Sequence, residues 1–155
     1  MSYDQKFMAL KDLPPVPKVP EGAHYILYRQ NGKLLTLSGN GPLWGSDIPP
    51  EYLGKLGKDL TPEQGYAAAR LTGMNLLQVA RSALGSLDQV HYIINIEGSV
   101  HCTDSFTQQA EVINGCSDLL VEVFGENGKH TRSALGCNAL AFNICVEISM
   151  SLKLR

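Results

Sequence analysis

The sequence predicts an α+β fold, in which two helices cover one face of a mixed β-sheet. Three patterns indicate this fold class. The pair Asn31-Gly32 separates two segments that have the composition of a β-hairpin. Two longer segments carry helix start and stop signals, and the closing residues 143–153 alternate apolar and polar side chains. Because two helices can cover only one face of such a sheet, the other face must meet water or another protein surface.

The length and composition limit the class of protein. A chain of 155 residues is expected to form one domain, residues 1–155. Its net charge is −2 and it has no basic block, so we expect no binding of nucleic acid through phosphate neutralisation. It has no recognisable signal peptide and no apolar run long enough to span a membrane. We therefore expect no membrane partner. Its four cysteines form no C-x-x-C pair, which predicts a cytoplasmic protein with reduced, buried thiols and no metal site.

Residues 1–22 are expected to form a short helix followed by a proline-rich strap. Ser2 and Gln5 have the spacing of a capping box, which favours a helix over residues 2–11. The four prolines between Pro14 and Pro20 then stop this helix and favour an extended segment. We expect the strap to lie on the surface of the domain.

The next segments predict a hairpin and, later in the chain, a third strand. The hairpin is expected to pair strands near 24–30 and 33–38 through a two-residue type I′ turn at Asn31-Gly32. The third strand lies in residues 88–100, where two sets of side chains alternate. One set is Val90, Tyr92, Ile94 and Ile96, and the other is His91, Ile93 and Asn95.

A long loop and the first long helix lie between these strands. Residues 39–60 are rich in glycine and proline, and they form either a functional loop or an ordered surface loop pinned by Trp44 and Leu53. The motif Thr61-Pro62-Glu63-Gln64 then predicts a capped helix start, and the helix is expected to end at Gly85. The residues of one helical stripe, spaced three and four apart, are Ala69, Gly73, Leu76, Ala80, Ala83 and Leu84. The small residues among them suggest a close approach to the sheet.

The second long helix and two closing strands complete the expected order. The helix lies within Thr107–Phe124, with Leu119, Leu120, Val123 and Phe124 as core candidates. The strands are expected at 130–139 and 143–153. One face of the last strand is Ile144, Val146, Ile148, Met150 and Leu152, and the other is Asn143, Cys145, Glu147, Ser149 and Ser151. This second face lacks the usual large polar groups, so we expect it to pack against another copy of the chain.

Arg132 and Glu147 are the candidate reactive pair, because they are the only full charges between His130 and Lys153. A guanidinium binds a carboxylate through two parallel hydrogen bonds, and a carboxylate on a nearby strand can polarise a water molecule. The two residues therefore suit an anionic substrate that is attacked by water. A simple ion pair between them remains the alternative.

The chain resembles the YjgF-type Rid family, the reactive-intermediate (enamine/imine) deaminases formerly labelled endoribonuclease L-PSP. The resemblance covers about Tyr25 to Leu154 and rests on Tyr25, Ser38-Gly39, Arg132-Ser133 and Val146-Glu147-Ile148. The segments LGKDLTPEQGYAAARLTGMNLL and VINGCSDLLVEVFGENGKHTRSALG point to a less-characterised branch of the family. The resemblance implies a chorismate-mutase-like fold of the bacillus type and a homotrimer with a cleft at each subunit interface. It also implies a cofactor-free hydrolysis of 2-imino or enamine acids to 2-keto acids and ammonia.

The resemblance assigns roles residue by residue. Arg132 would bind the carboxylate of a small metabolite, and Glu147 would position the attacking water. The residues expected to line the cleft are Tyr25, Ser38, Gly39, Ala134, Ser117 and Asn114. The cleft asparagine of the family has no direct equivalent: Ser117 falls near its position, and Asn114 lies one helical turn earlier.

The chain departs from the family pattern at the cleft wall. Leu140-Ala141 stands where Leu-Pro is usual, Ser149 replaces a second glutamate, and Asn40 replaces a glutamine. Two other functions therefore stay open beside the deaminase. One is a trimer that binds a small carboxylate without turnover, and the other is an endoribonuclease or translation inhibitor.

Overall fold

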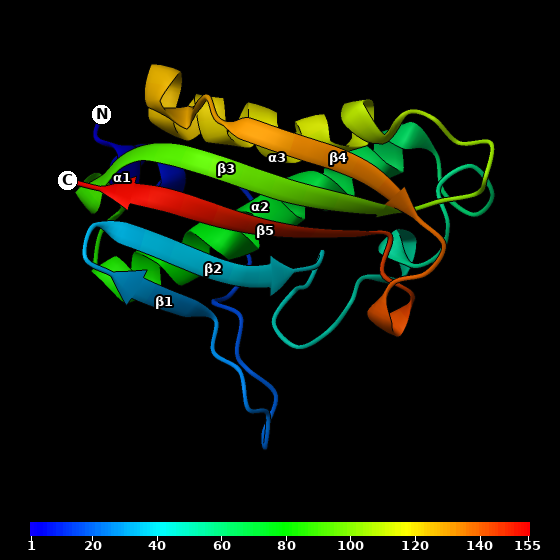
Figure 1. The fold of residues 1–155 in the computed structure, drawn as a ribbon, viewed down its shortest axis with the longest axis horizontal. Helices are drawn as coiled ribbons and strands as arrows, with labels where there is room; N and C mark the ends of the chain where they lie inside the picture. The colour runs from blue at the N-terminus through cyan, green and yellow to red at the C-terminus, as the bar shows by residue number, and fades with distance from the viewer.

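A computed structural model, which describes all of residues 1–155, contains a five-stranded mixed sheet with helices on one face (Figure 1). The strand order is β1-β2-β5-β3-β4; β3 and β4 are parallel, and the other neighbours are antiparallel. The strands are β1 Tyr28–Asn31, β2 Leu34–Asn40, β3 Val90–His101, β4 Thr131–Cys137 and β5 Val146–Leu154. The helices are α1 Tyr3–Met8, α2 Pro62–Leu84 and α3 Gln109–Phe124. The predicted α+β class is confirmed.

The predicted helix boundaries rest on real caps. The side chains of Ser2 and Thr61 each accept a hydrogen bond from the backbone N–H of the third helical residue, which is a glutamine. The side chain of that glutamine accepts a hydrogen bond from the backbone N–H of Ser2 or Thr61. Gly85 ends α2 in the left-handed region at φ +81°. Helix α3 ends at Phe124, as the following Gly125 suggested.

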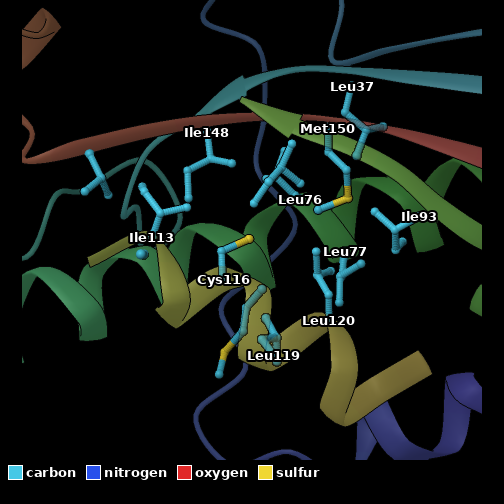
Figure 2. Close-up of a cluster of buried hydrophobic side chains, with 14 of the residues drawn as sticks. Leu37, Leu76, Leu77, Ile93, Ile113, Cys116, Leu119, Leu120, Ile148 and Met150 are labelled. Atoms are coloured by element: carbon cyan, nitrogen blue, oxygen red, sulfur yellow. The ribbon is translucent and has the colours of Figure 1, made fainter. Parts of the chain in front are cut away.

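The hydrophobic core lies between the sheet and the pair α2 and α3 (Figure 2). Fully or almost fully buried members are Leu37, Ile93, Ile148 and Met150 from the strands, and Leu76, Leu77, Ile113, Cys116, Leu119 and Leu120 from the helices. Each such side chain contributes about 1.5–3 kcal/mol by leaving water. The core therefore fixes which face of every strand turns inward, and that orientation decides where the polar residues can point.

The small residues of α2 allow close contact with α3, and not chiefly with the sheet as predicted. A Cβ atom on Gly73 would lie 2.9 Å from Leu119 Cδ2 and 3.1 Å from Cys116 Sγ. From the other side, a Cβ on Gly115 of α3 would lie 2.0 Å from the backbone oxygen of Tyr66. The two helices thus touch backbone to backbone at Gly115.

The hairpin turn differs from the predicted type I′. Asn31 pairs with Leu34, so the two turn residues are Gly32 and Lys33. Only Gly32 has a positive φ, +60°. A type I′ turn needs positive φ at both positions, whereas type II′ places glycine first, and the turn belongs to that second kind. The hairpin itself is confirmed, with strands that begin a few residues later than expected.

The predicted alternation along β3 is wrong at its start. Val90, Ile93 and Ile96 are buried, while Tyr92 is exposed. The pairing of β3 with β5 shifts register between Val90 and Tyr92 and again between Ile93 and Asn95. Each bulge adds one residue to β3, so the side-chain alternation is reset twice.

Strand β5 begins at Val146, later than predicted. Residues 141–143 form a short 3₁₀ turn, and Phe142 and Asn143 have φ of +57° and +61°. Cys145 was expected on the open face, but it is completely buried because the segment around Tyr52 covers it. From Val146 onward the strict alternation holds.

The loop of residues 39–60 is ordered, but Trp44 does not pin it. The Trp44 side chain is 44% exposed, whereas Leu56 is fully buried and anchors the loop. Leu53 forms an isolated bridge with Ile144. The buried Asn75 of α2 donates hydrogen bonds to the carbonyl oxygens of residues 41 and 43, at 3.1 and 2.8 Å. None of the helices has the length and apolarity that crossing a bilayer requires.

The contact between α2 and α3 yields a matched pair of variants. Both Gly115→Ala and Gly73→Ala improve helix propensity by roughly 1 kcal/mol. The new methyl at Gly73 meets side-chain atoms that can move, but at Gly115 it meets the backbone of Tyr66. We expect Gly115→Ala to lower the free energy of unfolding by about 3 kcal/mol and Gly73→Ala by about 1 kcal/mol or less, measured by urea denaturation. Equal losses would contradict this account of the helix contact.

Candidate functional site

Arg132 is held by helix α3 on the covered side of the sheet. Its Nη1 donates to Asn114 Oδ1 at 2.8 Å and to Ser117 Oγ at 3.1 Å. Its Nη2 lies 3.4 Å from the carbonyl oxygen of Ala110. Both helix residues that the family resemblance singled out therefore hold the guanidinium, since they lie one turn apart on the same face of α3.

The guanidinium of Arg132 has no carboxylate partner in the chain. The salt bridges of the structure are Arg70–Glu122, Arg81–Asp4 and Lys129–Glu126. No Arg132–Glu147 ion pair forms within one chain, so the alternative of such a pair in the subunit interface stays a prediction. Because all partners of Arg132 are neutral, its positive charge is oriented but not neutralised. Such a group can bind a carboxylate supplied from outside.

A histidine completes the support of Arg132. His130 Nδ1 lies 2.6 Å from the carbonyl oxygen of Gly128, which can only accept, so Nδ1 carries the proton. In the neutral ring, Nε2 is then an acceptor and receives a hydrogen bond from the Ser117 hydroxyl at 2.9 Å. This leaves the lone pairs of Ser117 directed at Arg132. A neutral His130 therefore satisfies every donor and acceptor of this chain of hydrogen bonds.

Burial favours that neutral form. Loss of solvation lowers the pKa of His130 below its ordinary value, and the nearby positive charge of Arg132 acts in the same direction. The hydrogen bond to Gly128 opposes this shift and is outweighed. The imidazole thus stays uncharged near neutrality, and Ser117 keeps its orientation toward the guanidinium.

Glu147 faces the opposite side of the sheet. It alternates with the buried residues Val146 and Ile148, so its exposed carboxylate points away from the helices. It borders a cavity of about 460 Å³ that Tyr25 and Gly39 also line. A Cβ on Gly39 would lie 3.3 Å from Cγ and Cδ of Glu147, so the absence of a side chain there leaves room beside the carboxylate.

The remaining predicted residues divide between the two sides. Tyr25 is 52% exposed at the cavity. The Ser38 hydroxyl does not line the cavity; it donates to the carbonyl oxygen of Ile26 and so holds the segment that carries Tyr25. Ala134 lies two residues from Arg132 on the same strand face and packs against the core.

One chain cannot bring Arg132 and Glu147 to the same small molecule. Arg132 pairs with Ile96, and Glu147 pairs with Ser99, on the two sides of β3. With about 4.8 Å between strands and about 3.3 Å per residue, their Cα atoms lie roughly 14 Å apart, with side chains on opposite faces. Within one chain the two charges therefore lie at two separate places, which we call the Arg132 and Glu147 half-sites.

A larger hollow contains neither half-site. Its volume is about 670 Å³, and it lies beside α2, where Trp44, Tyr52 and Met74 contribute to its walls. None of the predicted site residues borders it.

Sequence reasoning missed His130 and the walls of the cavity. His130 lies two residues before Arg132, a spacing that places both side chains on one strand face, and this was the available signal. No comparable signal marks Pro17, Val19 or Phe142, which come from irregular segments and meet at the cavity only in the folded chain.

This fold is that of a known family, and the chain belongs to it. Residues 9–151 match the family described as "YjgF/chorismate_mutase-like, putative endoribonuclease". Protein TCP17 of Trypanosoma cruzi is 37% identical over 142 residues, which cover 88% of each chain. The predicted family membership and chorismate-mutase-like fold are thus confirmed.

Two solved structures are also similar over almost the whole chain. The protein Atu1372 of Agrobacterium tumefaciens, described as of unknown function, is 32% identical with a TM-score of 0.89, covering 99% of this chain and 92% of that one. A protein of Shewanella oneidensis MR-1, described as a putative endoribonuclease, is 29% identical with a TM-score of 0.91, covering 99% and 100%.

The neutral state of His130 makes stability depend on pH. Unfolding frees the imidazole to take up a proton, so the stability of the folded chain decreases as the pH falls below about 6.5. His130→Asn keeps a donor for Gly128 but does not titrate. We expect the melting temperature of the wild type to fall more steeply than that of the variant between about pH 7.5 and 5.5.

The matched control is His24→Asn, which changes an exposed histidine without a hydrogen bond and should follow the wild-type curve. Parallel curves for the wild type and His130→Asn would show that the His130 ring does not carry this pH dependence.

Proposed function

We propose that this protein assembles with itself, as a homotrimer, and hydrolyses 2-imino acids to 2-keto acids and ammonia in a cleft between subunits. The observation that carries the proposal is the state of the two charges. Arg132 is fixed by neutral acceptors only, and Glu147 stands unpaired at a cavity. One charge suits the substrate carboxylate, and the other suits a water molecule.

The chemistry needs only these two roles. An enamine acid tautomerises to its imine, whose carbon is electrophilic. Glu147 takes a proton from water as the oxygen bonds to that carbon, and this proton passes to the imine nitrogen, which gives a carbinolamine. Transfer of the hydroxyl proton of the carbinolamine to its amino group then lets the C=O bond form as the C–N bond breaks, so ammonia leaves and the 2-keto acid remains. Arg132 holds the carboxylate throughout and fixes the imine carbon relative to the water.

The geometry of a single chain supports assembly. Both charges must contact one substrate of only a few atoms, yet they lie on opposite faces of the sheet. A second copy that lays its edge strand β4 near the open face of the first would bring Arg132 of one chain to Glu147 of the other. The open face also carries Ser133, Leu135 and Ser149, which are short or apolar. Besides Glu147, its charged side chains are Glu97 and Lys153.

Binding of a small carboxylate without turnover is the second candidate. The Glu147 side chain receives no hydrogen bond within the chain, and Ser149 cannot supply a second carboxylate. If Glu147 is equally unrestrained in the assembly, Arg132 alone would define a binding protein. The experiment below separates the two functions, since both need Arg132 but only hydrolysis needs Glu147.

The family description and the name of the Shewanella protein both include the word endoribonuclease. The charge of this chain gives less support to RNA cleavage. The net charge is −2, and a polyanionic strand is normally bound by several basic groups. We therefore do not propose it.

Two variants test the proposal through ammonia release from a freshly generated 2-aminoacrylate-type substrate. Arg132→Ala removes carboxylate binding, and Glu147→Gln removes the base, so we expect each to lower the rate by about 100-fold or more. Arg29→Ala and Glu111→Gln change exposed residues outside both half-sites and should keep the wild-type rate. Wild-type rates in Arg132→Ala would exclude the deaminase, and retained carboxylate binding there would exclude the binding protein as well.

Mixing the two inactive variants tests whether the cleft joins two chains. In randomly reassembled trimers, about a quarter of the interfaces pair an intact Arg132 with an intact Glu147 from the neighbouring subunit. We expect that fraction of the wild-type activity after unfolding and refolding the mixture. If both residues act within one chain, the mixture stays inactive.

A further inference from the structure

We propose that the substrate carries a large apolar side chain, which the cavity beside Glu147 accepts. This inference rests on the proposed function and names the substrate class of that site. It starts from the size of the cavity, about 460 Å³, which is within the range that binds compounds of drug size. The imine of pyruvate, 2-iminopropanoate, has only about six non-hydrogen atoms and would leave most of this space unfilled.

The walls of the cavity are mainly apolar and come from three separate segments. Pro17 and Val19 belong to the N-terminal strap, Leu43 and Ile48 to the loop after β2, and Phe142 to the turn before β5. Glu147 supplies the carboxylate at the sheet. A substrate whose reacting carbon lies at Glu147 therefore projects its side chain among apolar groups, while its carboxylate meets Arg132 of a neighbouring copy.

These walls are held in place from outside the cavity. Gln78 of α2 donates to the carbonyl oxygen of Pro14 at 2.7 Å and so ties the strap to the helix. Asn75 of the same helix donates to the carbonyl oxygen of Leu43 at 2.8 Å. Because α2 belongs to the core, the cavity is formed before any ligand arrives, which favours a selective pocket.

Phe142 combines two properties that are unusual for a phenylalanine, high exposure and a positive φ. Its side chain is 82% exposed, and its φ of +57° lies in a region that non-glycine residues rarely occupy. Asn143 shares the unusual conformation, and its carbonyl oxygen accepts a hydrogen bond from the backbone of Gly54 at 2.9 Å. A fixed turn that holds an exposed aromatic ring at the rim of a cavity fits a wall that closes on an apolar group.

The test uses stable 2-keto acids as probes of the same site, with binding measured by calorimetry on the assembled protein. We expect phenylpyruvate and 4-methyl-2-oxopentanoate to bind at least about ten-fold more tightly than pyruvate, because a well-filled apolar pocket distinguishes single methylene groups. Equal affinities for the three acids would overturn the inference.

Two variants assign the selectivity to the walls. Phe142→Ala should weaken phenylpyruvate binding several-fold and leave pyruvate unchanged, and Val19→Asn should do the same from the opposite wall. Val121→Ala, an exposed apolar residue of α3 outside the cavity, serves as the control and should change neither affinity. Unchanged selectivity in both wall variants would overturn the inference.

Two further measurements distinguish a failure of the proposed function from a failure of the proposed substrate class. Arg132→Ala should abolish binding of every acid; if it does not, the proposed function fails and the substrate class fails with it. If pyruvate binds in an Arg132-dependent manner but the apolar acids gain nothing, only the substrate class is wrong. Light scattering on Phe142→Ala should show an intact assembly, and dissociation would assign Phe142 to a contact between copies and overturn its role as a wall.

Discussion

The alternation of side chains along β4 and β5 is the constraint on which the functional argument depends. The core turns Ile148 and its alternate neighbours toward the helices, and Glu147 must then face the other way. Arg132 faces the helices, because α3 offers it acceptors there. A one-residue slip of β5 would expose its buried side chains, so the hydrophobic pattern fixes the side on which Glu147 lies. Strand β4 has no buried residue, and Arg132 is instead fixed by its hydrogen bonds to α3 and by the pairing of β4 with β3. A reaction that needs both charges then needs two chains.

The same constraint explains why Arg132 is surrounded by neutral groups. A carboxylate within reach would form a strong ion pair and leave little attraction for a substrate. An unsupported guanidinium, on the other hand, would be poorly placed and unfavourably desolvated. Asn114, Ser117 and the backbone of Ala110 satisfy hydrogen bonds without removing the charge. The neutral ring of His130 extends this arrangement by fixing the direction of the Ser117 hydroxyl.

Sequence patterns predicted the elements whose signals are local. The capping motif at Thr61 and the stop at Gly85 bound helix α2 correctly, since each depends on a few neighbouring residues. The bulges in β3 were not predictable, because a bulge is defined by the partner strand and leaves the apolar run from Val90 unchanged in composition. The predicted turn type was wrong for a related reason. The register of the two strands, and not the dipeptide Asn31-Gly32 alone, decides which residues form the turn.

The candidate site shows the same division between local and distant information. Arg132 and Glu147 stood out in the sequence because they are isolated charges among small residues, and their family positions gave them roles. Their opposite orientations became visible only with the helices in place. Ser38 was expected from the family resemblance to line the cleft, and within one chain its hydroxyl donates to the backbone of Ile26 and supports the segment of Tyr25.

The two half-sites are built from different kinds of structure, and this difference has a consequence for specificity. Arg132 and Glu147 lie on paired strands, whose positions are fixed by the ladder and by the core. The walls around Glu147 come from the strap, a loop and a turn, where residues can change without disturbing the sheet. A fold arranged in this way can keep one set of reactive groups while its irregular segments adapt to different side chains. The turn at Phe142, with its positive φ, lies in these irregular segments, so the proposed substrate class depends on a part of the chain that the sheet does not fix.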